Sequence, residues 1–241
     1  MIHSIMTTYG TSYGGWKLPP NTVLDNNSIV ISAGVGEDIS FDLEIQSKFG
    51  CSVYLVDPTE RAIRHVEEVK AFYSSDKPMF SGDIQHDYIQ CIKNLKPDFS
   101  KIHIDALGLW NKSDNLKFYK QTNPTYVSQT LIPEMFGQEY TSVPVVRLST
   151  LLEQHGLIGR PIALLKMDIE GAEIEVLESL IEDKIYPQTL CVEFDYLLKG
   201  KDKTKRTETI IDRLGSVGYK IIYNDKWNVV FQWANPDMCT N

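Results

Sequence analysis

The alternation of short apolar segments with helical patterns constrains the fold of this chain more than any other feature of its sequence. Seven segments rich in β-branched and aromatic residues have the length and composition of strands. They are residues 28–33, 52–56, 101–104, 163–167, 189–194, 219–223 and 228–233. Helical patterns lie between most of them, as over 59–73, where Ala62, Val66 and Val69 follow helical spacing. Strands that alternate with helices predict a parallel sheet covered by helices on both faces.

The last two apolar segments depart from this rule. Only the sequence NDKW separates 219–223 from 228–233, which is too short for a parallel crossover and suits a hairpin. We therefore predict an α/β fold with a doubly wound sheet of seven mostly parallel strands, the last of which is antiparallel. A single domain over residues 1–241 accommodates such a sheet and a sizeable core.

Charge, cysteine spacing and hydropathy argue against several classes of protein. A net charge of −8 disfavours a general nucleic-acid binder, whose phosphate-facing surface is basic. Cys51, Cys91, Cys191 and Cys239 show no C-x-x-C spacing, which favours free thiols in a reducing compartment. The N-terminus lacks the features of a signal peptide, and no apolar run approaches the ~20 residues of a membrane helix. We expect a soluble, cytoplasmic protein that binds neither nucleic acid nor membrane; its oligomeric state stays open.

The first predicted strand runs directly into the sequence SAGVGEDISFD, which suits a cofactor-binding turn. Gly34 and Gly36 stand where the backbone must approach a ligand without a Cβ atom in the way. Asp57, at the end of the second predicted strand, can accept hydrogen bonds from both hydroxyls of a ribose. The three residues together predict a nucleoside-bearing cofactor.

Two features of this turn favour S-adenosylmethionine over NAD as that cofactor. Ile39 occupies the position of the third glycine in the dinucleotide-binding fingerprint. Glu37, which follows the second glycine, is a poor neighbour for a pyrophosphate. The same carboxylate is a good neighbour for the ammonium group in the methionine part of S-adenosylmethionine.

The sequence LLKMDIEGAEIEVLESL, residues 164–180, places two acids between a predicted strand and a predicted helix. Buried carboxylates are costly unless they are paired, and ligands of doubly wound sheets bind beyond the carboxyl ends of the strands. Asp168 can therefore take the proton of an acceptor hydroxyl, with Glu170 beside it. Lys166 lies on the same side of the strand as Asp168 and can keep it ionised or contact the acceptor.

Two alternatives for these acids remain. Asp168, Glu170 and Glu193 can instead ligate Mg²⁺ or Mn²⁺ through their oxygen atoms. We favour a metal-free base, because no histidine accompanies the acids and Lys166 would repel a cation. Alternatively, Glu170 and Glu173 merely complement the dipole of the following helix.

The chain resembles a known family through the stretches SAGVGEDISFD, VYLVDPT, ALGLW, VPVVRLSTLL and LLKMDIEGAEIEVLESL. They are similar to the FkbM-type family of S-adenosylmethionine-dependent O-methyltransferases over about residues 12–233, and the K-x-D-x-E-G-A-E core is the most specific of them. The resemblance implies the seven-stranded, Rossmann-like class I methyltransferase fold. It also implies that Ala106 belongs to the cofactor site, and that the acceptor is a hydroxyl of a sugar, a nucleotide-sugar or a glycan.

Three irregular segments are expected to surround this site. Residues 1–27 are predicted to act as a lid, and residues 107–147 to form a hairpin and an acceptor loop. The basic run 199–206 is interpreted as a solvated loop or as a binding element for the phosphates of a nucleotide-sugar. His103 is expected to be a core histidine rather than a pocket residue.

Two other functions remain as alternatives. An NAD-dependent oxidoreductase would share the glycine turn and Asp57, but the chain has no convincing hydride-transfer pair. A non-catalytic cofactor-binding module would share the fold, although Asp168 and Glu170 would then have no task. We predict a methyltransferase that uses S-adenosylmethionine and leave the identity of its acceptor open.

Overall fold

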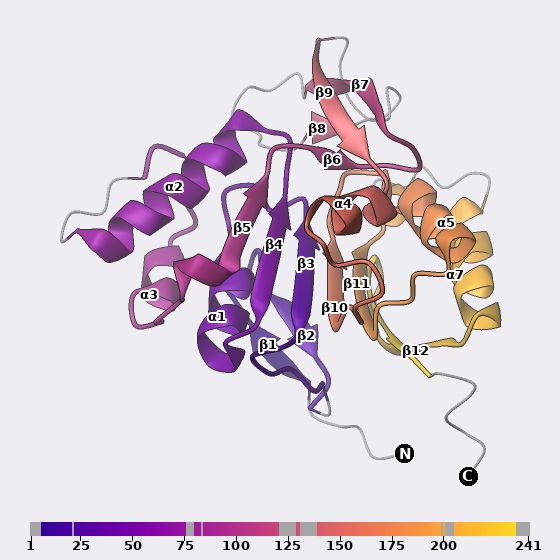
Figure 1. Cartoon of the computed structure of the whole chain (residues 1–241), viewed down its shortest axis with the longest axis horizontal. Coiled ribbons are helices and arrows are strands. Elements are labelled where there is room, and N and C mark those ends of the chain that lie inside the picture. The colour runs from indigo at the N-terminus through magenta and orange to yellow at the C-terminus, as the bar shows by residue number, and fades with distance from the viewer. Residues whose placement is uncertain are drawn as a thin grey trace.

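A seven-stranded sheet with helices on both faces forms the centre of the molecule (Figure 1). The structure is a computed structural model that describes residues 6–20, 22–75, 80–82, 84–120, 129–130, 139–198, 200 and 205–234. Parts of the predicted 107–147 and 199–206 segments, and Cys239, lie outside these residues. Among the described helices, none combines the length and the apolar content that crossing a membrane requires.

The strands of the central sheet follow the order β12-β13-β11-β10-β3-β4-β5. Their bounds are Ile29–Ala33 (β3), Ser52–Val56 (β4), Ile102–Asp105 (β5), Leu164–Met167 (β10), Thr189–Glu193 (β11), Tyr219–Asp225 (β12) and Asn228–Trp233 (β13). The pairs β10–β11, β10–β3, β3–β4 and β4–β5 are parallel, whereas β13 is antiparallel to both of its neighbours. Each predicted segment forms one strand, so the predicted sheet with its antiparallel last strand is confirmed.

Helices cover the two faces of the sheet in two groups. Their bounds are Ser40–Phe49 (α1), Glu60–Ser74 (α2), Tyr88–Ile92 (α3), Leu148–Gln154 (α4), Glu173–Asp183 (α5), Asp195–Leu198 (α6) and Arg206–Ser216 (α7), with a short 3₁₀ turn at Phe99–Lys101. Apolar residues of α1, α2 and α3 pack in one core cluster, and those of α4, α5 and α7 pack in the other. All five residues of β3 are buried, as expected of a strand covered on both faces.

Local signals explain where two of these helices begin and end. Thr59 precedes α2, and its hydroxyl accepts a hydrogen bond of 3.2 Å from the backbone amide of Ala62. Gly50 ends α1 in the left-handed conformation, at φ +67°. Helix α3 has five residues, and Ile84 and Leu95 on either side of it also pack on the core.

Two further groups of strands stand outside the central sheet. The first was not predicted from the sequence, whereas the second falls in the segment 107–147, where a hairpin was expected. Strands β1 (Thr7–Tyr9) and β2 (Trp16–Leu18) form an antiparallel hairpin before the first strand of the central sheet. A second sheet has the order β6-β9-β7-β8, with bounds Gly108–Leu109 (β6), Asp114–Lys120 (β7), Gln129–Thr130 (β8) and Tyr140–Val146 (β9). In Figure 1 this small sheet lies at the top of the view, beyond the carboxyl end of β5.

Candidate active site

The glycine turn after β3 touches the chain that follows β10. Gly34 has φ +73°, and a Cβ atom added to it would lie 1.7 Å from the carbonyl oxygen of Asp168. The amide of Gly34 donates a hydrogen bond of 2.9 Å to the carbonyl of Val56, at the end of β4. Only glycine fits here, for both its backbone angle and its lack of a side chain. The turn thus joins the carboxyl ends of three adjacent strands.

Asp57 holds this turn in shape. One of its carboxylate oxygens accepts hydrogen bonds from the amides of Val35 (3.1 Å) and Gly36 (3.0 Å). The other accepts from the amide (2.9 Å) and the hydroxyl (2.6 Å) of Thr59. Asp57 is 5% exposed. Its predicted contact with a ribose stays a prediction, and the structure adds a role that the sequence did not show.

The other residues predicted to bind the cofactor lie at the same end of the sheet. Gly36 has φ +55°, and no described atom lies within 4 Å of the position where a Cβ would stand, so the turn borders open space. Glu37 is buried and accepts two hydrogen bonds from Arg61, at 3.0 and 2.6 Å. Ala106 is exposed just after β5. The pairing of Glu37 with Arg61 was not visible in the sequence, because it depends on how α2 packs.

Asp168 directly follows β10 and is half-buried. Burial and the negative charge of Glu193 raise its pKa well above the usual value, Glu170 raises it further, and Lys166 opposes the rise. The structure therefore brings the predicted acids Asp168, Glu170 and Glu193 within electrostatic range of one another. A carboxylate with a raised pKa is a stronger base, which suits proton transfer from an alcohol.

The turn after Asp168 has a strained backbone and is stabilised by a buried carboxylate. Glu170 has φ +58° and Gly171 has φ +103°. A non-glycine residue in the left-handed region costs on the order of 1 kcal/mol. The carboxylate of Glu173, which is fully buried, accepts hydrogen bonds from the amides of Ile169 (3.1 Å) and Gly171 (3.0 Å). Glu173 thus fixes this turn, beyond the complement to the helix dipole expected from the sequence.

Lys166 lies beneath the glycine turn rather than at its surface. It is 3% exposed, and its Nζ atom donates a hydrogen bond of 3.4 Å to the carbonyl of Gly34. Burial raises the pKa of the neighbouring Asp42 to about 6, and the positive charge of Lys166 opposes this rise. Two roles were predicted for Lys166. Its burial favours an effect on the charge of Asp168 over contact with an acceptor.

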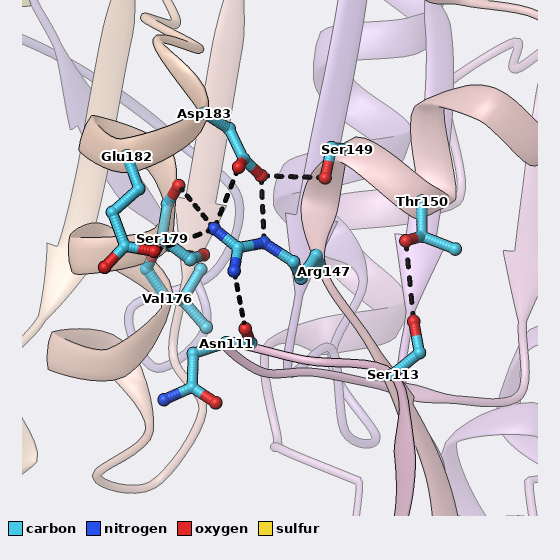
Figure 2. Close-up of polar contacts among 9 residues, drawn as sticks. All are labelled: Asn111, Ser113, Arg147, Ser149, Thr150, Val176, Ser179, Glu182 and Asp183. Atoms are coloured by element: carbon cyan, nitrogen blue, oxygen red, sulfur yellow. Dashed lines mark hydrogen bonds and ion pairs between the residues drawn. The ribbon is translucent and has the colours of Figure 1, made fainter.

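Arg147 ties the small sheet to the core (Figure 2). Its guanidinium donates to both carboxylate oxygens of Asp183, at 3.0 and 2.8 Å, and to Glu182 at 3.0 Å. It also donates a hydrogen bond of 2.9 Å to the carbonyl of Asn111. Because Asn111 lies between β6 and β7 and Asp183 ends α5, Arg147 fixes the small sheet against the helix layer. Ser149 adds a 2.7 Å hydrogen bond to Asp183.

His103 lies outside this group of acids. Its ring stacks on Tyr54 with ring centroids 4.7 Å apart, while the neighbouring His155 binds both carboxylate oxygens of Asp105 at 2.9 and 3.0 Å. Burial and the charge of His155 lower the pKa of His103. The structure places His103 in a packed aromatic cluster beside α4.

Two other features bear on where ligands bind. Among the residues that the structure describes, no group of three His, Cys, Asp or Glu side chains is arranged to hold a metal ion. The Mg²⁺ or Mn²⁺ alternative at Asp168, Glu170 and Glu193 stays a hypothesis. A cavity of about 610 Å³ lies between α4 and α5, beside Ser149 and Tyr186. It borders the amino ends of β10 and β11, whereas ligands of doubly wound sheets bind at the carboxyl ends.

Comparisons with known proteins identify the family of this chain. A family model described as "Methyltransferase FkbM domain" matches residues 17–221. A fibrillarin pre-rRNA processing protein of Methanococcus jannaschii is 11% identical, with a TM-score of 0.40 over 98% of this chain and 85% of that chain. A fibrillarin of Aeropyrum pernix, solved with natively bound S-adenosyl-L-methionine, is 8% identical, with a TM-score of 0.39 over 95% of this chain and 82% of that chain. Likenesses at this level carry no inference about the acceptor. A search of curated proteins finds no match.

Proposed function

This chain belongs to the FkbM methyltransferase family, and on that premise we propose that it transfers the methyl group of S-adenosylmethionine to a hydroxyl of a sugar or glycan. The family establishes a methyltransferase that uses this donor, and it sets aside the alternative of an NAD-dependent oxidoreductase. The choice of a hydroxyl group and of a carbohydrate is our proposal. The observation that carries it is the placement of Asp168 beside the glycine turn, with a raised pKa.

The residues around the glycine turn fit this donor. When bound, S-adenosylmethionine supplies a methyl carbon activated by a positively charged sulfonium. The open space beside Gly36 lets the backbone approach a ligand closely. The carboxylate of Asp38, which is 7% exposed, lies next to that turn and favours a cationic ligand over a phosphate, whereas the charge of Glu37 is balanced by Arg61.

Asp168 is the base in the proposed reaction. An alcohol is a poor nucleophile until it loses its proton. The carboxylate of Asp168 would accept that proton, so that the acceptor oxygen would be the nucleophile for the methyl carbon that the bound donor would supply. Burial and the charge of Glu193 strengthen the base by raising the pKa of Asp168, and the positive charge of Lys166 opposes this rise. A positioned base of this kind contributes about a hundredfold to ten-thousandfold in rate.

The acceptor side of the site is proposed to lie between the small sheet and the N-terminal hairpin. Both stand outside the regular α/β scaffold, and loops positioned on a rigid scaffold commonly carry substrate contacts. The strained turn at Glu170 supports the same location, because such strain persists where the surrounding structure enforces it.

Transfer of an isotopically labelled methyl group tests the proposal. The full chain is incubated with labelled S-adenosylmethionine and with separate sets of sugars, glycans, small proteins and RNA, and the products are analysed by mass spectrometry. We expect a labelled methyl ether on a carbohydrate. Labelling of protein or RNA in place of carbohydrate contradicts the acceptor class. A chelator arm separates the mechanisms, because a metal-free base keeps its rate in the chelator and a metal-assisted one loses it until Mg²⁺ or Mn²⁺ is restored.

A further inference from the structure

Glu173, the first residue of α5, connects this helix to the turn that follows Asp168. One of its carboxyl oxygens, Oε1, accepts hydrogen bonds from the amides of Ile169 (3.1 Å) and Gly171 (3.0 Å). These two amides lie on either side of Glu170, whose φ of +58° strains the backbone. A single atom of Glu173 therefore holds the chain before and after the strained residue.

The backbone of Asp168 is fixed on both sides. Its own amide donates a hydrogen bond of 3.1 Å to the carbonyl of Ala33, the last residue of β3. The next amide along the chain, that of Ile169, donates to Glu173. The central sheet thus holds the peptide group before Asp168, and Glu173 holds the peptide group after it. Because the allowed rotamers of a side chain depend on its backbone angles, the second hydrogen bond affects the direction of the Asp168 carboxylate.

The environment of Glu173 favours a carboxyl group that acts as an acceptor rather than as a charge. Its side chain lies in the core, at 0% exposure, and its Oε2 atom has no hydrogen-bond partner within the described part of the chain. A buried charge is costly unless it is paired, whereas a neutral carboxyl group still accepts hydrogen bonds through its carbonyl oxygen. Burial raises the pKa of Glu173 well above its usual value, and the hydrogen bond from Gly171 opposes this rise.

We propose that Glu173 is a positioning residue for Asp168, and that it sets the direction of the Asp168 carboxylate through the length of its side chain and not through a charge. This inference rests on the proposed function, because Asp168 is the base only in that proposal. It differs from the expectation that Glu173 complements the dipole of α5, since a dipole effect requires a negative charge. Substitutions can separate length from charge.

Two conservative variants make this separation. Glu173→Gln keeps the length and an acceptor oxygen but carries no charge, whereas Glu173→Asp keeps the carboxyl group and is one methylene shorter. Methyl glycosides and short neutral oligosaccharides serve as acceptors, with saturating S-adenosylmethionine. We expect Glu173→Gln to transfer methyl groups at close to the wild-type rate. Glu173→Asp and Glu173→Ala should be slower by about tenfold or more, because a misplacement of about 1 Å can cost a hundredfold.

Donor affinity separates a positioning role from a general loss of structure. The affinity for S-adenosylhomocysteine should stay near that of the wild type in all three variants, because Asp57 still holds the glycine turn through the amides of Val35 and Gly36. The opposite order of rates, with Glu173→Asp near the wild type and Glu173→Gln as slow as Glu173→Ala, overturns the inference. It would show that the charge of Glu173 is what matters.

Hydrogen exchange provides a second measurement, which needs no acceptor. The amides of Ile169 and Gly171 should exchange faster in Glu173→Asp and Glu173→Ala than in the wild type and Glu173→Gln, because they lose their acceptor. Val176→Ala is the matched control, since Val176 is fully buried in the same helix and its side chain has no polar atom to hold the turn. It should leave both exchange and methyl transfer near the wild-type rates. An equal loss of transfer in Val176→Ala overturns the inference.

The two measurements together separate this inference from the proposed function. Faster exchange at Ile169 and Gly171 with methyl transfer at the wild-type rate shows that Glu173 does not position Asp168, and overturns the inference alone. If the wild type transfers no methyl group to any of these carbohydrates, the proposed function is overturned instead. The exchange rates then still decide whether Glu173 holds the turn through its length.

Discussion

The backbone of Gly34 lies so close to that of Asp168 that a Cβ atom at Gly34 would stand 1.7 Å from the carbonyl oxygen of Asp168. The turn assigned to the cofactor and the residue assigned to proton transfer are therefore in direct contact. A change in the position of one must move the other. The proposed donor turn and the proposed base therefore form one rigid unit, and a displacement reaction requires such fixed positions.

Gly34→Ala should abolish binding of S-adenosylhomocysteine and lower the free energy of unfolding. The added methyl group meets a backbone carbonyl, and the backbone angle of φ +73° adds strain. Gly159→Ala is the control, because Gly159 has φ +76° but no described atom within 4 Å of its Cβ position. Gly34→Ala should cost at least about 2 kcal/mol more than the control in denaturant unfolding. Equal costs would show that the contact with Asp168 does not constrain the turn.

Asp57→Ala should weaken the binding of S-adenosylhomocysteine by about 1–3 kcal/mol, because hydrogen bonds to a charged group are lost. The amides of Val35 and Gly36 lose their acceptor, so the turn loses its shape. Titration calorimetry measures the change. Thr59→Val is the comparison, since it removes a hydroxyl that contacts Asp57 only on the side away from the glycine turn. Thr59→Val should lower the free energy of unfolding but leave the affinity for S-adenosylhomocysteine near that of the wild type. If Asp57→Ala binds S-adenosylhomocysteine as tightly as the wild type does, Asp57 does not belong to the cofactor site.

The titration of Asp42 should lower the free energy of unfolding as the pH rises from about 4 to about 6. Burial raises its pKa from the usual 3.8 to about 6, so the folded state holds more protons than the unfolded state between these values. The linkage relation then gives a decreasing free energy of unfolding across this window, by up to about 3 kcal/mol. Asp42→Asn should remove this part of the pH dependence and be more stable than the wild type at pH 7.

Chemical denaturation at several pH values checks the prediction for Asp42. Glu67→Gln serves as the control, because the side chain of Glu67 is 61% exposed and its charge is solvated in both states. The same pH slope in Asp42→Asn as in the wild type would show that Asp42 does not titrate in this window.

Arg147→Lys should lower the free energy of unfolding by about 1–2 kcal/mol and raise KM for the acceptor more than it changes donor affinity. Lysine keeps the charge but cannot bind both oxygens of Asp183 and the carbonyl of Asn111 at once (Figure 2). The small sheet, which is proposed to border the acceptor, would then be held less firmly. Arg160→Lys is the matched control, because within the described part of the chain its guanidinium makes a single hydrogen bond, of 3.4 Å, to the carbonyl of Asn27. If both variants change the free energy of unfolding and KM equally, Arg147 does not anchor the small sheet.

The inner strands of the central sheet were predictable because they are buried on both faces. A strand such as β3 then appears in the sequence as a continuous run of apolar residues, independent of what packs on it. The hairpin of β1 and β2 was not predictable, since strands as short as Thr7–Tyr9 contain no periodic signal. Within the site, the glycines and strand-end acids were visible as local patterns. The pairing of Glu37 with Arg61 and the support of the turn by Glu173 were not, because such contacts depend on tertiary packing.

The placement of Tyr13 shows the same limit. The sequence YGTSYGGW indicated a lid from its aromatic residues and glycines. It contained no information on the partners of Thr11, which lie far along the chain at Asp38 and Ser40. Only the fold places the loop that carries Tyr13 beside the glycine turn.

Turnover of Asp168→Asn tests the central claim most directly. The amide keeps the shape of the side chain but cannot accept a proton, so turnover should fall about a hundredfold or more while affinity for S-adenosylhomocysteine stays unchanged. In the wild type the logarithm of the rate should rise with pH through the raised pKa of Asp168 and then level off. In Asp168→Asn this dependence should disappear. Wild-type turnover in Asp168→Asn, with the pH profile intact, would contradict the assignment of Asp168 as the base.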